Sequence, residues 1–199
     1  MSDDGFALTS PVAVGGRGGR DSLDHYPTPR WCVLSLLAQE VFSGGTVLDP
    51  SCGEGSILDV LLERGATTLG IEYHAHRAFA ARARGHKVAI NDALLVDWPE
   101  ADAVVGNPPY SLGLAFARKA VAWARQAPHR SAYLLLRLSF LEPAAGRGAF
   151  FAESPPDVLI LPRRPSFDGR GTDSSTSAWF CWPSTSGRPG EGRLVWLPS

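Results

Sequence analysis

Four consecutive residues near the middle of the chain, Asn107-Pro108-Pro109-Tyr110, combine groups that could act on a planar amine. The two prolines lack backbone N–H donors and stiffen the turn, so this segment presents acceptors and a ring. The Asn107 side-chain oxygen and a free backbone carbonyl can each accept one hydrogen of an –NH2 group. Such contacts draw the nitrogen lone pair out of conjugation and aim it at an electrophile such as a methyl sulfonium. Tyr110 offers a face on which a planar substrate could stack.

A second group of candidate residues lies upstream, in the segment Asp49-Pro50-Ser51-Cys52-Gly53-Glu54-Gly55. It follows a short apolar run and precedes a helical pattern, which is where open α/β sheets bind ligands. The two glycines let a ligand approach the backbone closely. The spacing differs from dinucleotide and triphosphate loops, lysine is absent, and Asp49 would repel a phosphate. A carboxylate here suits a ligand with an ammonium group, such as S-adenosylmethionine.

Two further acids, Glu72 and Asp92, each follow a later apolar run. Glu72 comes roughly 20 residues after the glycine segment and is spaced to accept both hydroxyls of a ribose. Asp92 could accept a hydrogen from the cofactor's adenine amino group. Either acid could instead only cap the helix that follows it. Because Asp49, Glu72 and Asp92 are all predicted at the same edge of the sheet, binding of the cofactor is favoured over separate helix caps.

The elements that would position these residues alternate in type along the chain. Helical periodicity runs through residues 30–42, 56–64, 76–83 and 112–127. Strand-like apolar runs occupy residues 45–48, 68–71, 87–90, 103–105, 132–136, 158–161 and 178–182, with a further edge strand at 194–197. Short buried strands separated by helices predict a largely parallel sheet covered on both faces. The expected fold is a single-domain, doubly wound, Rossmann-like α/β sandwich.

The bulk composition suits one folded domain. The chain has 199 residues, of which 44% are hydrophobic and 20% charged, and its net charge is -1. It contains no apolar run long enough to cross a bilayer, and its acidic start differs from a secretory signal, so we expect a cytoplasmic protein that does not engage membranes. Residues 1–24 are expected to be a disordered arm, 25–182 the domain and 183–199 a loop or tail.

Neither the cysteines nor the overall charge points to a further type of site. Cys32, Cys52 and Cys181 are far apart and form no CxxC pair, so no disulfide framework and no metal site are expected. The near-neutral charge gives no bulk argument for nucleic acid, and such binding would depend on local arginines.

The motifs resemble those of adenine-specific (N6-amino) DNA methyltransferases. Residues 49–55 look like the first motif of that family and residues 107–110 like its fourth. Tyr26-Pro27-Thr28-Pro29 resembles the upstream motif, in which a Thr-Pro pair helps hold the methionine part of the cofactor. The order of the three motifs matches the gamma arrangement. A less specific similarity to small phage and prophage adenine methylases covers residues 137–142, 164–167, 172–174 and 178–180.

The resemblance implies a class I methyltransferase fold that binds S-adenosyl-L-methionine and methylates a flipped adenine in DNA. It implies catalytic roles for Asn107, Pro108, Pro109 and Tyr110. It implies cofactor contacts for Thr28, Pro29, Asp49, Pro50, Ser51, Cys52, Gly53, Gly55, Glu72, Tyr73, Asp92, Ala93 and Asn107. Nucleic-acid contacts are expected from Arg163, Arg164, Phe167 and Arg170, with Phe140 competing with Phe167 as a second aromatic against the base.

This chain departs from the family in one respect. Members that read a defined DNA site usually carry a sizeable recognition domain after the catalytic loop, and nothing of that size follows here. We therefore expect short or relaxed sequence recognition, carried largely by residues 162–177. The oligomeric state is left open between a monomer and a weak dimer.

Several alternatives use the same catalytic logic. The glutamine methyltransferases of release factors also act on a planar –NH2 group, but that resemblance would imply a helical domain before the cofactor segment, and only 48 residues precede Asp49. The amines of adenine or guanine in RNA stay open, because these motifs do not distinguish RNA from single-stranded DNA. A non-catalytic scaffold would be expected to lose the catalytic loop or the cofactor acids, and both are present.

Overall fold

The central strands are apolar on both sides, and this pattern requires a layer of helices on each face of the sheet. A computed structural model describes residues 27–39, 45–143, 146–166, 175–183 and 191–198. Its strands are β1 (Thr46–Asp49), β2 (Thr67–Glu72), β3 (Lys87–Ile90), β4 (Ala103–Gly106), β5 (Ser131–Arg137), β6 (Asp157–Ile160), β7 (Ser177–Pro183) and β8 (Leu194–Trp196). Its helices are α1 (Arg30–Leu37), α2 (Ser56–Glu63), α3 (Ala75–Ala83), α4 (Gly113–Ala124) and α5 (Arg147–Glu153), with the 3-10 turns η1 (Tyr110–Leu112) and η2 (Leu138–Leu141).

The described strands form one sheet in the order β3-β2-β1-β4-β5-β7-β6-β8. The neighbouring pairs from β3 to β5 are parallel, and β6 is parallel to β8. Strand β7 is antiparallel to both β5 and β6. The largely parallel sheet predicted from the alternating pattern is therefore confirmed, with β7 as the reversed strand.

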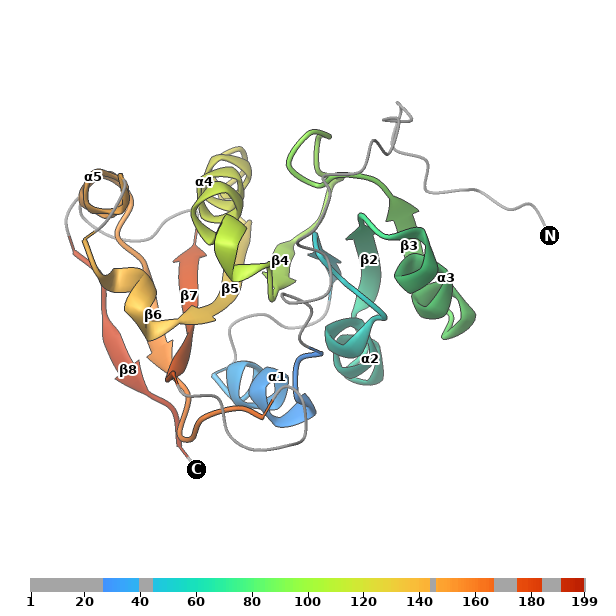
Figure 1. Cartoon of the computed structure of the whole chain (residues 1–199), viewed down its shortest axis with the longest axis horizontal. Coiled ribbons are helices and arrows are strands. Elements are labelled where there is room, and N and C mark those ends of the chain that lie inside the picture. The colour runs from blue at the N-terminus through green and yellow to red at the C-terminus, as the bar shows by residue number, and fades with distance from the viewer. Residues whose placement is uncertain (1–26, 40–44, 144–145, 167–174, 184–190, 199) are drawn as a thin grey trace.

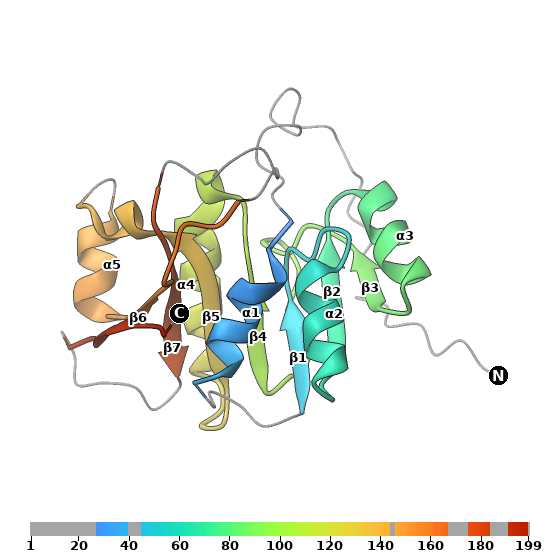
Figure 2. The ribbon, with the colours of Figure 1, turned by 90° about the horizontal axis from the view of Figure 1, so that it is seen from below.

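Helices cover both faces of the sheet, as Figures 1 and 2 show: α4 and α5 lie on one side, α1 and α2 on the other. Along β5, Leu134 and Leu136 join the core beneath α4 and α5, whereas Tyr133 and Leu135 join the core beneath α1 and α2. Because successive side chains of a strand point to opposite faces, this alternation buries β5 on both sides.

The structure differs from the predicted elements mainly at helices. Helix α1 ends at Leu37, earlier than predicted, and residues 40–42 of that predicted helix lie outside the described ranges. The helix predicted for 112–127 divides into η1 and the shorter α4. Helix α5 was not predicted, because seven residues that include Gly148 carry too little periodicity. Within the described part of the chain, no helix is long and apolar enough to span a membrane.

The strand order creates a switch point beside β1. The chain passes from β1 to β2 and β3 on one side, and then returns to place β4 on the other side of β1. The loops that follow β1 and β4 therefore leave the sheet in opposite directions, and ligands of open α/β sheets bind in the crevice between such loops. Both motif-bearing loops, residues 49–55 and 107–110, start at this point.

Candidate active site

The two loops touch where they leave the sheet. Val47 and Leu48 of β1 pair with Ala103 and Val104 of β4, which brings Asp49 beside Gly106. A Cβ added to Gly106 would lie 3.1 Å from Asp49 Oδ1 and 3.2 Å from Pro50 Cδ. Contacts this close disfavour any larger residue at 106 unless the neighbouring loop shifts. The predicted catalytic loop, residues 107–110, therefore begins directly against the Asp49 carboxylate.

Asp49 is a buried acid, with 1% of its surface exposed. Burial raises the pKa of its carboxyl to about 7, although the backbone N–H of Ser51 opposes the shift by donating to Oδ1 over 3.0 Å. The nearby charge of Glu72 raises this pKa further. A cation at this position would stabilise the ionised carboxylate. The adjoining Ser51 hydroxyl is buried and also opposes the shift, because a hydrogen bond from it favours the ionised Asp49 carboxylate.

The glycine segment is held by Glu72 at the end of β2. The backbone N–H of Gly53 donates to Glu72 Oε2 over 2.9 Å, and the N–H of His74 donates to Oε1 over 2.7 Å. Gly53 and Gly55 both adopt positive φ angles, 54° and 92°, which suit glycine. Glu72, the predicted ribose-binding acid, thus fixes the shape of the glycine segment, and each of its oxygens can accept a further hydrogen bond.

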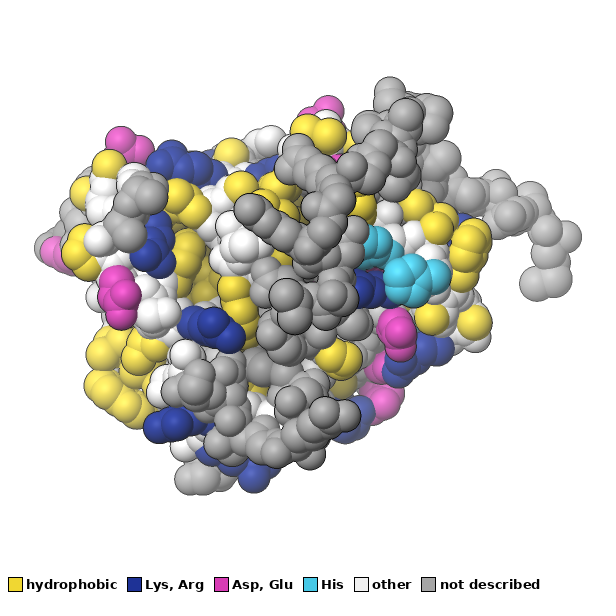
Figure 3. All heavy atoms as spheres, viewed as in Figure 1, with side chains coloured by type: hydrophobic (Ala, Val, Ile, Leu, Met, Phe, Trp, Pro, Cys, Tyr) yellow, Lys and Arg dark blue, Asp and Glu magenta, His cyan; other side chains and the backbone are white. Residues whose placement is uncertain are grey.

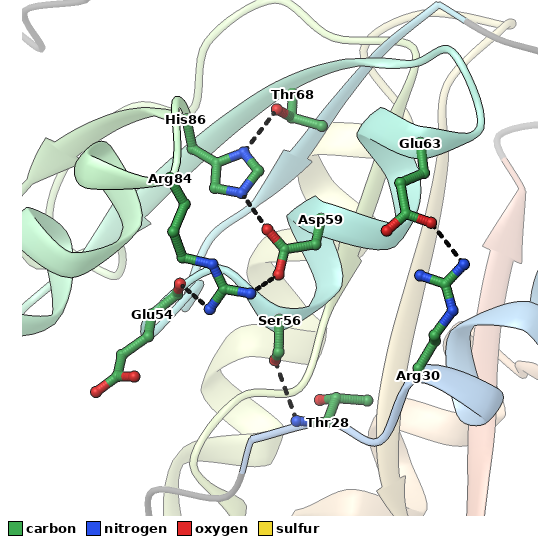
Figure 4. A network of polar contacts seen from close by, with 9 residues as sticks. All are labelled: Thr28, Arg30, Glu54, Ser56, Asp59, Glu63, Thr68, Arg84 and His86. Carbon is green, nitrogen blue, oxygen red and sulfur yellow. Dashed lines mark hydrogen bonds and ion pairs between the residues drawn. The ribbon is translucent and has the colours of Figure 1, made fainter.

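A cluster of polar side chains, Asp59, Arg84 and His86, contacts the same glycine segment (Figure 4). Asp59 of α2 pairs with Arg84, and its Oδ1 lies 2.8 Å from His86 Nε2. Arg84 also donates to the carbonyl of Glu54 over 3.2 Å. A Cβ on Gly55 would lie 2.8 Å from His86 Cδ2, so the ring packs directly against the loop. The sequence does not predict this cluster, because its members are far apart in the chain and form no motif.

Three other predicted cofactor residues, Asp92, Ala93 and Tyr73, lie in different surroundings. Asp92 is half-buried, and its Oδ1 accepts the N–H of Leu94 over 2.9 Å, so it also closes the turn after β3. The Ala93 side chain packs in the core, and its carbonyl accepts from Trp98 Nε1 over 2.8 Å. Tyr73 is half-buried and meets the ring of His74 edge-on at 5.1 Å.

The predicted catalytic loop contacts the segment that precedes α1. Asn107 is half-buried, and its Nδ2 donates to Thr28 Oγ1 over 3.1 Å. Pro108 is buried, and Pro109 lies just before η1, which Tyr110 begins. The guanidinium carbon of Arg137 lies 4.7 Å from the centroid of the Tyr110 ring. The loop is thus fixed at its amide by Thr28 and at its aromatic ring by Arg137.

The residues expected to contact nucleic acid are only partly described. Arg163 and Arg164 are exposed, and the Arg163 guanidinium carbon lies 4.7 Å from the Trp31 ring centroid. Phe167 and Arg170 lie outside the described residues. The competing aromatic, Phe140, is buried and packs edge-on against Phe151 and Phe180, each at 5.5 Å, so it serves the core.

Comparison with known proteins finds similarity to methyltransferases over parts of the chain. Residues 33–102 match the family model of the methionine biosynthesis protein MetW, a stretch that ends before the catalytic loop. Over 85 residues the chain is 36% identical to a protein of Pyrobaculum aerophilum described as ribosomal RNA small subunit methyltransferase A. That alignment covers 40% of this chain and 36% of the relative.

Solved structures show the same fold over most of the chain. A Listeria monocytogenes protein assigned to the class I S-adenosylmethionine-dependent methyltransferases aligns with a TM-score of 0.65 at 13% identity, over 92% of this chain and 68% of that one. A modification subunit assigned to a type I restriction enzyme of Vibrio vulnificus YJ016 aligns with a TM-score of 0.61 at 15% identity. It covers 87% of this chain, which spans 46% of the subunit. The chain therefore has the Rossmann-like fold of class I S-adenosylmethionine-dependent methyltransferases.

Proposed function

We propose that this chain transfers the methyl group of S-adenosylmethionine to the exocyclic amine of adenine in DNA. The observation that carries the proposal is the position of Asn107-Pro108-Pro109-Tyr110. This loop leaves β4 beside the buried Asp49 carboxylate, and its amide is held by Thr28. An amine acceptor loop therefore adjoins a site suited to a cationic cofactor.

The residues around Asp49 fit the cofactor. S-adenosylmethionine carries an ammonium group, which would compensate the buried Asp49 carboxylate. Glu72 and Asp92, at the ends of β2 and β3, would accept from the ribose hydroxyls and the adenine amino group. When bound, the cofactor supplies an electrophilic methyl group on a sulfonium.

The chain's own residues would act on the amine. Asn107 Oδ1 and the carbonyl of Pro108 would each accept one N–H of the adenine amine, which frees the nitrogen lone pair from the ring. The nitrogen then forms its bond to the methyl carbon as the carbon–sulfur bond breaks, and the displaced amine proton leaves to solvent. Asn107 and Pro108 act here by orientation, since neither an amide nor a carbonyl takes up that proton.

Exposed arginines support a nucleic acid as the carrier of the adenine. Arg163 and Arg164 follow β6, and the stacking of Arg163 on Trp31 orders its guanidinium at the protein surface. Figure 3 shows Lys and Arg side chains scattered over the visible surface among hydrophobic and acidic ones, including the part of it that α4 and α5 form. Arginines on that side include Arg118 and Arg147, whose guanidinium carbons lie 5.3 and 5.5 Å from the rings of Phe150 and Phe140. Phosphate contacts from such residues would help to hold an extruded base.

An adenine amine in RNA is the second candidate. It is favoured by the Pyrobaculum aerophilum relative, which is described as acting on ribosomal RNA and is 36% identical over 85 residues. The catalytic geometry proposed above would serve both substrates, because the amine and its ring are the same. The choice between them depends on the surface that receives the strand.

Transfer of labelled methyl groups to DNA, RNA and a release-factor protein, assayed side by side, tests the proposal. We expect label in DNA, recovered after digestion as N6-methyladenine. Label found mainly in RNA adenine would favour the second candidate. Label on glutamine of the protein, or on no substrate despite cofactor binding, would overturn the proposal.

A further inference from the structure

Thr28 uses its backbone N–H and its side-chain hydroxyl to join segments that are distant in the sequence. Its backbone N–H donates to Ser56 Oγ over 3.2 Å, as Figure 4 shows, and its Oγ1 accepts from Asn107 Nδ2 over 3.1 Å. These contacts span 28 and 79 positions of the chain. Thr28 is buried, with 5% of its surface exposed. It therefore bridges the start of α2, just after the glycine segment, to the catalytic loop.

We infer that Thr28 is a positioning residue whose hydroxyl anchors the Asn107 amide for the proposed methyl transfer. The resemblance to adenine methyltransferases assigns Thr28 to the methionine part of the cofactor, and orienting the catalytic amide is a different role. The inference rests on the proposed function in one respect only: the oriented amide is the group that receives the substrate amine.

The two ends of an asparagine amide are chemically opposite, and this makes its orientation decisive. Nδ2 is a donor and Oδ1 an acceptor, and an adenine –NH2 group offers only donors to them in this geometry. With Nδ2 directed at the Thr28 hydroxyl, Oδ1 is turned towards the other side of the amide and can accept. Rotating the amide by a half turn would set Nδ2 against the substrate hydrogens, where two donors face each other.

Thr28 can hold the Asn107 side chain in place because the segment that contains Thr28 is itself held in place. Pro27 and Pro29 flank it and restrict its backbone, since the residue before a proline is held extended. Helix α1, which follows directly, is held against α2 by an Arg30–Glu63 ion pair of 2.5 Å, visible in Figure 4. The indole N–H of Trp179 in β7 donates to the carbonyl of Cys32 over 2.9 Å and fixes the same helix to the sheet.

Thr28→Val tests the inference, because valine keeps the shape of threonine and removes the hydroxyl. We expect kcat to fall by about tenfold to a hundredfold, with the Kd for S-adenosylmethionine within about twofold of wild type. Thr28→Ser, which restores the hydroxyl, should recover kcat to within about threefold of wild type. Thr67→Val, at an exposed position at the start of β2, is the matched control and should leave both parameters unchanged.

Two kinetic outcomes would overturn the inference. A wild-type kcat in Thr28→Val would show that the hydroxyl does not orient the amide. Weakened cofactor binding with an unchanged kcat would assign Thr28 to the cofactor alone.

A measurement on the ligand-free protein separates this inference from the proposed function. The side-chain amide of Asn107 gives a pair of proton signals on one nitrogen, which an Asn107→Ala spectrum identifies by their disappearance. In Thr28→Val these signals should shift and exchange faster with water, whichever substrate the enzyme uses. Unchanged signals would overturn the inference even if the methyl transfer proves correct. Changed signals in a protein that methylates none of the substrates would uphold the orienting contact while the proposed function fails.

Discussion

Asp49 links protonation to cofactor binding at the scale of a single residue. Burial raises the pKa of its carboxyl to about 7 in the ligand-free protein, so this group binds a proton at a much higher pH than an ordinary aspartate. A bound ammonium group favours the ionised carboxylate, so binding should release that proton. The affinity for S-adenosylmethionine should therefore rise as the pH increases from about 5.5 to about 7.

Calorimetric titration in buffers of different ionisation enthalpy measures this proton release. At pH 6 we expect S-adenosylmethionine to release close to one proton in the wild type and close to none in Asp49→Asn. Methylthioadenosine, which has no ammonium group, is the matched ligand and should bind without this pH dependence. A wild-type affinity that stays flat over the same range would contradict the assignment of Asp49.

Tyr110 is expected to act through its ring. Base–aromatic stacking contributes about 1 to 3 kcal/mol per base, so Tyr110→Ala should lower turnover on DNA by about fivefold to a hundredfold or more. Tyr110→Phe keeps the ring, including the contact with the Arg137 guanidinium, and should lose much less. Steady-state kinetics of both variants provide the test. Equal losses would point to hydroxyl chemistry instead of stacking.

At the scale of the elements, the Asp59, Arg84 and His86 cluster ties α2 to the segment that leads into β3. The pKa of His86 is lowered, first because the buried ring is penalised when charged and then because Arg84 lies close by. Arg84 already pairs with Asp59, which reduces the capacity of that carboxylate to stabilise a protonated His86. The cluster is therefore expected to hold His86 neutral at pH 7. Protonation of this ring in acid should lower the stability of the folded protein.

This arrangement predicts how the free energy of unfolding changes with pH. Because the folded-state pKa of His86 lies below its unfolded value, the unfolded chain binds more protons below about pH 6.5, and stability falls as the pH drops. Asp49 acts in the opposite direction, since its raised pKa makes the folded state bind more protons between about pH 4 and pH 7. The contribution of His86 is therefore measured as the difference in the free energy of unfolding between the wild type and a variant that lacks this histidine.

Urea unfolding of the wild type and of His86→Gln, from pH 5 to pH 8, measures that difference. The variant can be less stable at every pH, because it loses part of the contact with Asp59. Its stability should nevertheless decline less steeply than that of the wild type below about pH 6.5. Parallel curves for the two proteins would contradict a buried, neutral His86.

At the scale of the whole molecule, the arginines after β6 should provide nucleic-acid affinity without base specificity. Replacing both Arg163 and Arg164 by alanine removes two exposed cations. DNA binding should weaken to a similar degree for unrelated sequences, and the slope of log K against log salt should flatten by up to about 1.8. Fluorescence anisotropy over a salt series gives both values. An unchanged salt slope would mean that the strand follows another surface.

Much of the fold could be predicted, because strand and helix periodicities are local. The strands through β5 were expected close to their observed bounds, since their side chains are buried on both faces. The reversed direction of β7 could not be predicted, because an apolar run carries no direction. Helix α5 has seven residues, too few for periodicity to distinguish it from a loop.

The candidate site likewise has a part that the sequence predicts and a part that depends on contacts between residues far apart in the chain. Asp49 and Asn107 stand in motifs with a chemical reason for their spacing, so the sequence alone predicts them as site residues. The contact of Asn107 with Thr28 spans 79 positions, and the support of Gly53 by Glu72 spans 19. Such contacts depend on the strand order around β1, which the sequence restricts only through general topology rules.

The central claim is that Asn107 orients the substrate amine and is not needed to bind the cofactor. Methyl transfer and S-adenosylmethionine affinity, measured together for Asn107→Ala, test it directly. We expect transfer to fall by more than about a hundredfold, or about 2.7 kcal/mol of barrier, with the Kd for the cofactor within about twofold of wild type. Transfer within about tenfold of wild type, or loss of transfer together with loss of cofactor binding, would contradict the claim.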